Sequence, residues 1–177
     1  TITTAGTLTF VTTGNCSIDA NQAGNASYQP AAKVTQSFAV NAGVPGAPTI
    51  GAATAGSSQA TVTFSPPGSN GGSTITSYTA TSNPGNKTGV GSASPITVTG
   101  LTNGQAYTFT VKATNSAGSG AASAASNSVT PKDSQSITFV NPGSQDFGTT
   151  PTLVATATSG LAVSFSSTTQ GVCTITT

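Results

Sequence analysis

Short runs in which apolar residues alternate with threonine or serine recur along this chain of 177 residues. In residues 60–64 the alternation sends Val62 and Phe64 to one face of a strand and two threonines to the other. Residues 107–113 repeat the pattern, as do residues 7–10 and 136–139 near the two ends. Clusters of Gly, Pro and Asn separate these runs, and stripes with a helical period are missing. The pattern predicts an all-β fold of antiparallel strands packed as sandwiches.

Composition narrows the classes of function. Charged residues make up 4% of the chain, against roughly 25% in a typical soluble domain, and the formal net charge is +1. Four lysines without arginine cannot neutralise a run of phosphates, so we expect no nucleic-acid partner. No apolar run approaches the roughly 20 residues that span a bilayer, so we expect no membrane insertion in this window. Because the chain begins at Thr1, we expect it to be a piece of a longer or processed protein.

The chain contains few side chains that could act in acid–base catalysis. The chain has no His, and its only acidic residues are Asp19, Asp133 and Asp146, which the sequence places beside strands or in a linker. A serine or threonine without a base to activate it remains an ordinary hydroxyl. Two cysteines without histidine cannot complete a tetrahedral zinc shell. We therefore predict that the protein is not an enzyme, with no catalytic residue, no cofactor and no metal.

The middle of the chain, residues 44–132, resembles a fibronectin type III domain. Residues 62–67 are similar to the second strand of that family, with Phe64 where the family usually carries Trp. Residues 100–111 resemble its structural corner, in which Leu101 packs and the Tyr107 phenol bonds back to nearby backbone. Residues 45–48 look like the family's first strand and residues 75–78 like its third. The resemblance implies a β-sandwich with Phe64 as its core aromatic residue.

The two ends of the chain read alike. Residues 1–4 and residues 174–177 are both Thr-Ile-Thr-Thr, so a shift of 173 positions overlays them. Joined in that way, residues 133–177 and 1–43 resemble the two halves of one bacterial immunoglobulin-like repeat of large surface proteins. Within it, residues 136–142 resemble the opening strand, residues 19–25 a later loop and residues 35–40 the closing strand. Coincidence in a threonine-rich chain is the alternative explanation of the overlap.

The two cysteines take on a role if the chain repeats. Cys173 of one copy and Cys16 of the next would then be sixteen residues apart, within one immunoglobulin-like domain. We predict a disulfide between adjacent repeats; the loop-entropy estimate for such a bond is roughly 3 kcal/mol. Two buried free thiols are the alternative. Because disulfides persist in oxidising compartments, we expect a secreted or cell-surface protein, of bacterial origin by the resemblance.

These observations favour a structural function. The hypothesis is a segment of a repetitive extracellular fibre, stalk or adhesin with a period of 173 residues, whose partners are neighbouring copies of itself. One alternative is a spacer, or a module that binds carbohydrate or a cell surface, in a secreted multidomain enzyme; Tyr28 is the one tyrosine not assigned to a core. The other is a filament subunit that polymerises by strand complementation. The integrin-binding tripeptide of some fibronectin type III domains is missing from the matching loop, residues 116–120.

Overall fold

The computed structural model describes residues 6–175, which divide into two compact units, Thr1–Lys132 and Asp133–Thr177. In the described residues the secondary structure consists of strands and turns, without helix. The strands are β1 (Gly14–Gln22), β2 (Ala31–Val40), β3 (Thr49–Gly56), β4 (Gln59–Ser65), β5 (Ser77–Asn83), β6 (Thr88–Gly91), β7 (Ile96–Thr99), β8 (Thr108–Asn115), β9 (Gly118–Ser119), β10 (Ile137–Phe139) and β11 (Ala155–Ala157).

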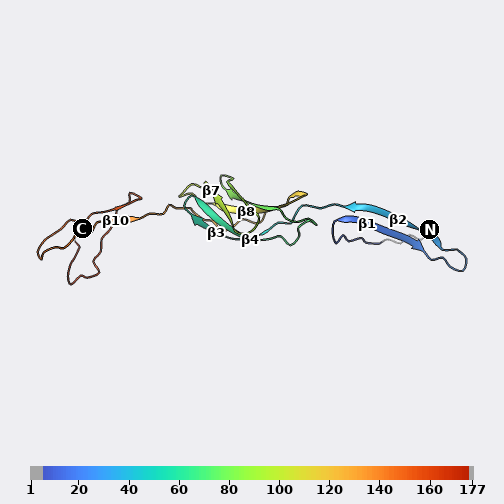
Figure 1. Ribbon diagram of the computed structural model, residues 1–177, viewed down its shortest axis with the longest axis horizontal. Helices are drawn as coiled ribbons and strands as arrows, with labels where there is room; N and C mark the ends of the chain where they lie inside the picture. The colour runs from blue at the N-terminus through green and yellow to red at the C-terminus, as the bar shows by residue number, and fades with distance from the viewer. Residues whose placement is uncertain (1–5, 176–177) are drawn as a thin grey trace. The chain divides into compact units, whose positions relative to one another are not determined.

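A two-layer sandwich forms the larger part of the first unit (Figure 1). One layer has the strand order β3-β4-β7 and the other the order β6-β5-β8-β9, with every neighbouring pair antiparallel. The alternation in the sequence explains the arrangement, because along β8 every second side chain is buried between the layers. The prediction of an all-β sandwich is thus confirmed.

The core of the sandwich is built from aromatic, branched and alanine side chains. Val62 and Phe109 are fully buried, and Phe64 is 7% exposed, which agrees with the inward face predicted for both alternating runs. Lys112 lies on the exposed face of β8. The buried apolar side chains are Ala53, Ala60, Val62, Phe64, Tyr78, Ala80, Ile96, Val98, Leu101, Tyr107, Phe109, Val111 and Ala113.

A serine-rich segment after β9 closes one edge of the four-stranded layer. Every third backbone N–H of this segment, at Gly120, Ser123, Ser126 and Val129, donates to a carbonyl on β8 or, for Val129, on Tyr107 just before it. These carbonyls belong to every second residue, so three residues of the segment lie opposite two of the strand. The Ser123 and Ser126 hydroxyls fill the mismatch by accepting hydrogen bonds from the N–H groups of Val111 and Phe109, at 2.9 and 3.0 Å. Because this edge is irregular, a further strand cannot pair with it as it could with a flat, regular edge.

Asn115 holds the segment that leads into the sandwich. It is 5% exposed, and its amide nitrogen donates to the carbonyls of Gly43 at 2.8 Å and Asn70 at 2.7 Å. Gly71 lies directly beside Gly43, at a φ of +71°, and a Cβ there would come within 2.1 Å of the Gly43 carbonyl oxygen. Only glycine satisfies both the positive φ and this close approach.

The β1–β2 pair is an antiparallel hairpin (Figure 1). Its two faces carry different kinds of side chain. On one face Ser17 and Ser37 share a hydrogen bond of 2.7 Å, and Asp19 and Thr35 lie opposite each other. The other face carries apolar side chains, among them Ile18. A bulge between Ala20 and Gln22 interrupts the pairing near the hairpin loop.

The second unit holds one short pair of strands, β10 and β11, which pair antiparallel with Ile137 opposite Ala157 and Phe139 opposite Ala155. The Phe139 ring lies 5.5 Å from the Phe165 ring, between centroids. The other described residues of this unit are turns and irregular segments. Ordered strand pairing in this unit is therefore confined to two three-residue strands.

Three local predictions were wrong. Residues 7–10 alternate like a strand but form none, because they have no backbone ladder with a neighbouring strand. Residues 45–48, expected as a first strand, precede β3, since Pro45 and Pro48 lack the N–H groups that a ladder needs. Residues 19–22 belong to β1 and not to a loop, because they pair with β2.

Candidate functional site

Asp19 of the hairpin forms an exposed ion pair with Lys33. Its Oδ2 accepts a hydrogen bond from Lys33 Nζ at 2.9 Å, and its Oδ1 accepts one from Thr35 Oγ1 at 2.6 Å. The Thr35 hydroxyl and then the Lys33 ammonium lower the pKa of Asp19 below its ordinary value of 3.8. Both side chains are solvated, so the pair contributes little to stability. Within residues 6–175 no group of three His, Cys, Asp or Glu side chains could hold a metal ion.

These charges predict an unusual response to pH. Residues 45–129 contain no Asp, Glu or His, so no side chain of the sandwich titrates between about pH 3 and pH 8. We expect its thermal midpoint to change by less than ~2 °C over that range. The stabilisation from the lowered pKa of Asp19 is present above 3.8 and is lost as the pH falls through the folded-state pKa, so acid should weaken β1–β2 slightly and leave the sandwich unchanged.

Amide resonances followed by NMR during an acid titration would separate the two responses. The amide signals of β1 and β2 around Asp19 should shift as its carboxylate is protonated, while those of the sandwich should stay in place. A Lys87→Ala variant is the control, because it removes a charge from the sandwich and leaves the Asp19 ion pair of the hairpin intact. A fall of more than ~5 °C in the sandwich midpoint at pH 3 would contradict the prediction.

The two cysteines occupy different units. Cys16 is half-buried on β1, and Cys173 is exposed near the end of the described residues. Hydrogen bonds of the Cys173 Sγ with the Ser167 hydroxyl (3.3 Å) and the Thr169 hydroxyl (3.6 Å) lower the pKa of this thiol. Within the one chain both cysteines are thiols. Because the predicted disulfide joins one copy to the next, it stays a prediction.

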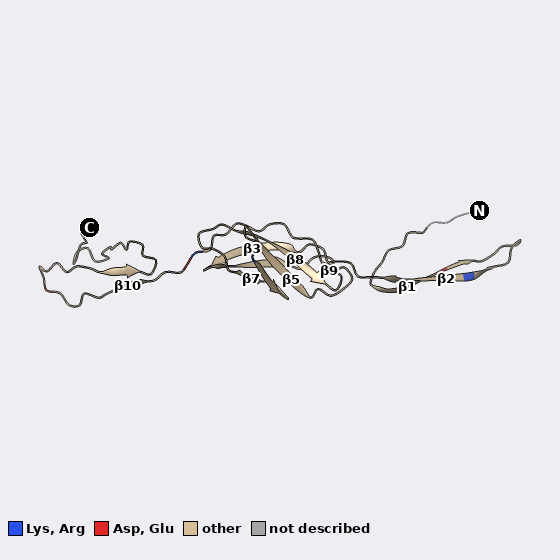
Figure 2. Ribbon diagram, turned by 90° about the horizontal axis from the view of Figure 1, so that it is seen from above, with Lys and Arg blue, Asp and Glu red and all other residues tan. Residues whose placement is uncertain are grey.

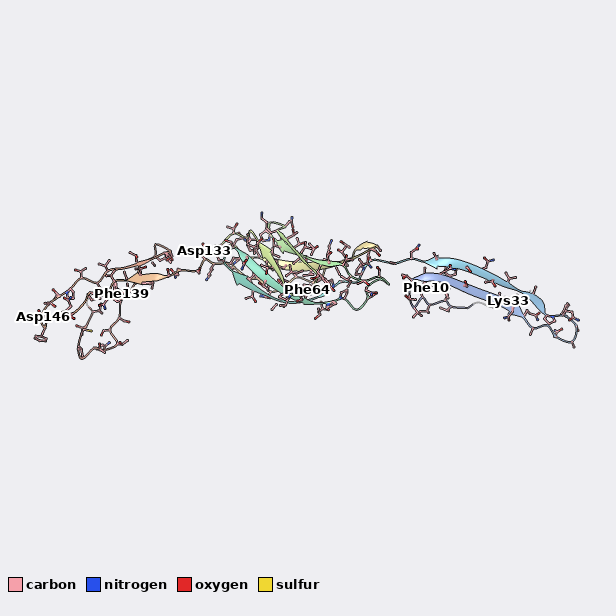
Figure 3. The ribbon with its side chains drawn as sticks, in the orientation of Figure 1. Phe10, Lys33, Phe64, Asp133, Phe139 and Asp146 are labelled. Carbon is pink, nitrogen blue, oxygen red and sulfur yellow. The ribbon has the colours of Figure 1, made fainter. Side chains whose placement is uncertain are left out.

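The residues of the expected corner lie together. The Tyr107 phenol oxygen accepts a hydrogen bond of 3.0 Å from the Thr102 backbone N–H, and Leu101 is 4% exposed. Tyr107 also pairs through its backbone with Val129, so the corner ties β8 to the last segment of the sandwich. Phe64 packs against Tyr78 with 4.7 Å between ring centroids (Figure 3).

Asn127 is a structural residue that the sequence analysis missed. Its side-chain amide bonds to both backbone groups of Ala53, accepting from the N–H at 2.8 Å and donating to the carbonyl at 3.0 Å. In this way it pairs like a strand residue at the bulge between Ile50 and Ala53 and joins the two layers. The 74 positions between the partners hide this contact from any local sequence pattern.

Exposed apolar side chains are concentrated on the two flanks of the sandwich. Val11 is 95% exposed, Val172 is 89% exposed and the Phe147 side chain is fully exposed. Figure 3 labels Phe10 beside the hairpin and Phe139 on β10, both of them more than half exposed. Charged groups are sparse by comparison (Figure 2). Most exposed large apolar side chains of the described residues therefore lie in residues 6–43 and 133–175, which precede and follow the sandwich in the sequence.

The fold places the middle of the chain in the class of immunoglobulin-like β-sandwiches. Its residues 45–129 match the family described as "Fibronectin type III domain", so this part of the chain, just under half of it, is a fibronectin type III domain. Such domains are typically non-catalytic modules of multidomain proteins, including cell-surface proteins. None of the curated proteins compared with the chain matches it.

Three solved structures that match parts of the chain are a rat, a chicken and a titin structure. The rat CD45 extracellular region, domains d3–d4, is 16% identical with a TM-score of 0.52, over 73% of this chain and 70% of that chain. The chicken CNTN1 FN1–FN3 domains are 24% identical with a TM-score of 0.46, over 52% and 35%. Titin kinase with its flanking domains is 26% identical with a TM-score of 0.45; the match spans 51% of this chain but only 18% of that one. The likeness to the CD45 domains supports the fold alone.

The search for membrane-spanning helices was negative. Across residues 6–175, no helix has the length and hydropathy needed to cross a bilayer.

Proposed function

We propose that this chain is a structural segment of a repetitive extracellular fibre, stalk or adhesin with a period of 173 residues. The observation that carries the proposal is the contrast between a finished sandwich in the middle and a two-stranded sheet on each flank. Two strands are too few for an independently stable sheet, so β1–β2 and β10–β11 each need further strands to form a stable sheet. The identical tetrads at residues 1–4 and 174–177, which lie partly outside the described residues, suggest that the missing strands come from the next copy.

The surface chemistry supports a mechanical function. Outward positions of β5 and β8 are filled with threonine and serine, with Asn83 and Lys112 as the exceptions. Such a surface carries few groups that respond to pH or salt. Low net charge also weakens repulsion between neighbouring copies, which favours repetition along a fibre.

The proposal includes a disulfide between Cys173 of one copy and Cys16 of the next. The half-buried position of Cys16 on β1 suits a bond inside a completed domain, and the lowered pKa of Cys173 favours the thiolate that forms it. Its formation requires an oxidant, such as a dithiol–disulfide oxidase, that accepts two electrons and two protons. The bond therefore accords with an exported protein, and the family resemblance favours a bacterial one.

A denaturing gel of native source material, run with and without reductant, tests the proposal. A covalent array gives a band far above 17.0 kDa that survives reduction. A ladder that collapses to 17.0 kDa with reductant supports separate subunits joined through Cys16 and Cys173. A protein that contains this segment once, beside a catalytic domain, would overturn the fibre in favour of a spacer in a secreted enzyme.

A further inference from the structure

The β1–β2 hairpin presents one bare apolar face. Ile18, Val34 and Phe38 share that face and are 42%, 55% and 38% exposed, and the polar Gln36 lies opposite Ile18 on the same face. Phe10 contacts Phe38 edge-on at 6.0 Å between ring centroids. The opposite face is already satisfied, since Asp19 on it is paired with Lys33 and Thr35. Burial of the apolar face would stabilise the hairpin by about 25 cal/mol per Å² of apolar surface removed from water.

The second unit contains a segment patterned as a strand but left without a ladder. In residues 161–167 the side chains of Val163 and Phe165 are half-buried, whereas those of Ser164 and Ser166 are exposed. This period of two is the pattern of a half-buried strand, yet the segment is irregular in the structure. Its apolar side continues to Phe139, whose ring packs on Phe165. The second unit thus has an uncovered apolar face of its own and an unpaired strand sequence.

Resting on the proposed function, we propose that residues 133–177 of a second copy cover the apolar face of the β1–β2 hairpin, with residues 161–167 added to the open edge of β1. This holds whether adjacent copies are covalently joined or separate. A single second copy would supply both things that the hairpin lacks, an apolar surface to cover its face and a strand to extend its sheet. Residues 161–167 carry no charge, so they bring no unpaired ion into the contact.

The outer edge of β1 suits the added strand better than that of β2. Pro30 directly precedes β2, and Lys33 lies on it; both are features of edges that are not extended. Addition to β1 continues the apolar row of Cys16 and Ile18 with Val163 and Phe165. The same addition places Ser164 on the polar face. It also brings the chain that leads to Cys173 beside the strand that holds Cys16.

Complementation between two disabled variants of the full chain tests the contact. Both carry Cys16→Ser and Cys173→Ser, so that a disulfide cannot hold them together. Ile18→Asp disables the hairpin of one, and Phe165→Asp disables the added segment of the other. We expect each alone to remain at 17.0 kDa by light scattering after gel filtration. Their mixture should form a dimer of twice that mass, because one intact hairpin meets one intact segment.

Val90→Asp serves as the matched control, because this apolar side chain is 68% exposed on β6 of the sandwich and belongs to neither proposed surface. The parent with both cysteines replaced, and the same parent with Val90→Asp, should self-associate with increasing concentration to the same extent. If the two disabled variants fail to rescue each other while the parent associates, another surface is used and the proposal is wrong. A parent that stays at 17.0 kDa at every concentration would equally overturn it.

Hydrogen exchange on the rescued dimer tests the choice of edge. In an antiparallel pair, half of the amide groups of β1 point away from β2. We expect those amides of the intact hairpin to become protected on dimer formation. Protection of the outward amides of β2 instead would refute addition to β1. Because these experiments use purified chains, they can succeed even if the gel of native material finds no fibre, and a fibre can exist even if they fail.

Discussion

Phe64→Ala is expected to destabilise the fibronectin type III domain by about 3–5 kcal/mol, the usual cost of removing a buried aromatic side chain. Phe64 is 7% exposed and packs its ring against Tyr78 at 4.7 Å. Its removal opens a cavity between the two layers that the surrounding strands fill only in part. Since small domains are stable by about 5–15 kcal/mol, this loss takes a large share of the total.

Chemical unfolding followed by tyrosine fluorescence measures this loss, because the chain has no tryptophan and the sandwich buries Tyr78 and Tyr107. Tyr28 is 74% exposed and should contribute an almost constant background. Phe147→Ala removes the same side chain from an exposed position and should change the unfolding free energy by less than ~0.5 kcal/mol. Equal effects of the two substitutions would show that Phe64 does not carry the core.

The second effect is expected from Tyr107→Phe, which should cost about 0.5–1.5 kcal/mol, the usual net contribution of one hydrogen bond. The substitution leaves the ring in place but removes the oxygen that accepts the Thr102 N–H at 3.0 Å. Thr102 is exposed, so its N–H loses the phenol acceptor but keeps access to water, which limits the loss. The corner between the layers would therefore weaken although its shape is unchanged.

Thermal and urea unfolding monitored by circular dichroism would report this change without depending on the altered tyrosine. Tyr28→Phe is the matched control, because its phenol is largely exposed, and it should be neutral within ~0.5 kcal/mol. An unfolding free energy for Tyr107→Phe that equals that of the parent would mean that water replaces the lost acceptor. The structural importance of the corner would then rest on packing by Leu101 and the ring alone.

Sequence alternation predicted the sandwich well because the side-chain period of a strand is a local property. Val62, Phe64 and Phe109 lie inward, as the period of two requires, and Lys112 lies outward. The same reasoning failed at residues 7–10, since alternation describes a strand but does not supply its partner. A strand exists only where backbone groups on a neighbour complete the ladder.

Contacts between distant positions could not be read from local patterns. Asn127 bonds to Ala53, 74 positions away, and Asn115 bonds to Gly43, 72 positions away. In the sequence both look like ordinary polar residues of turns. Their roles depend on the two layers having already come together, which brings unsatisfied backbone groups within reach of a side-chain amide.

The sequence by itself determined the all-β class, the inward and outward faces of the long strands and the near absence of titratable chemistry, because each follows from local periodicity or composition. Only the tertiary structure decided which edge of the sandwich is closed by serine hydroxyls and which flanking faces stay bare. Edges and faces are defined by what packs against them. That depends on neighbours far along the chain, which periodicity does not specify.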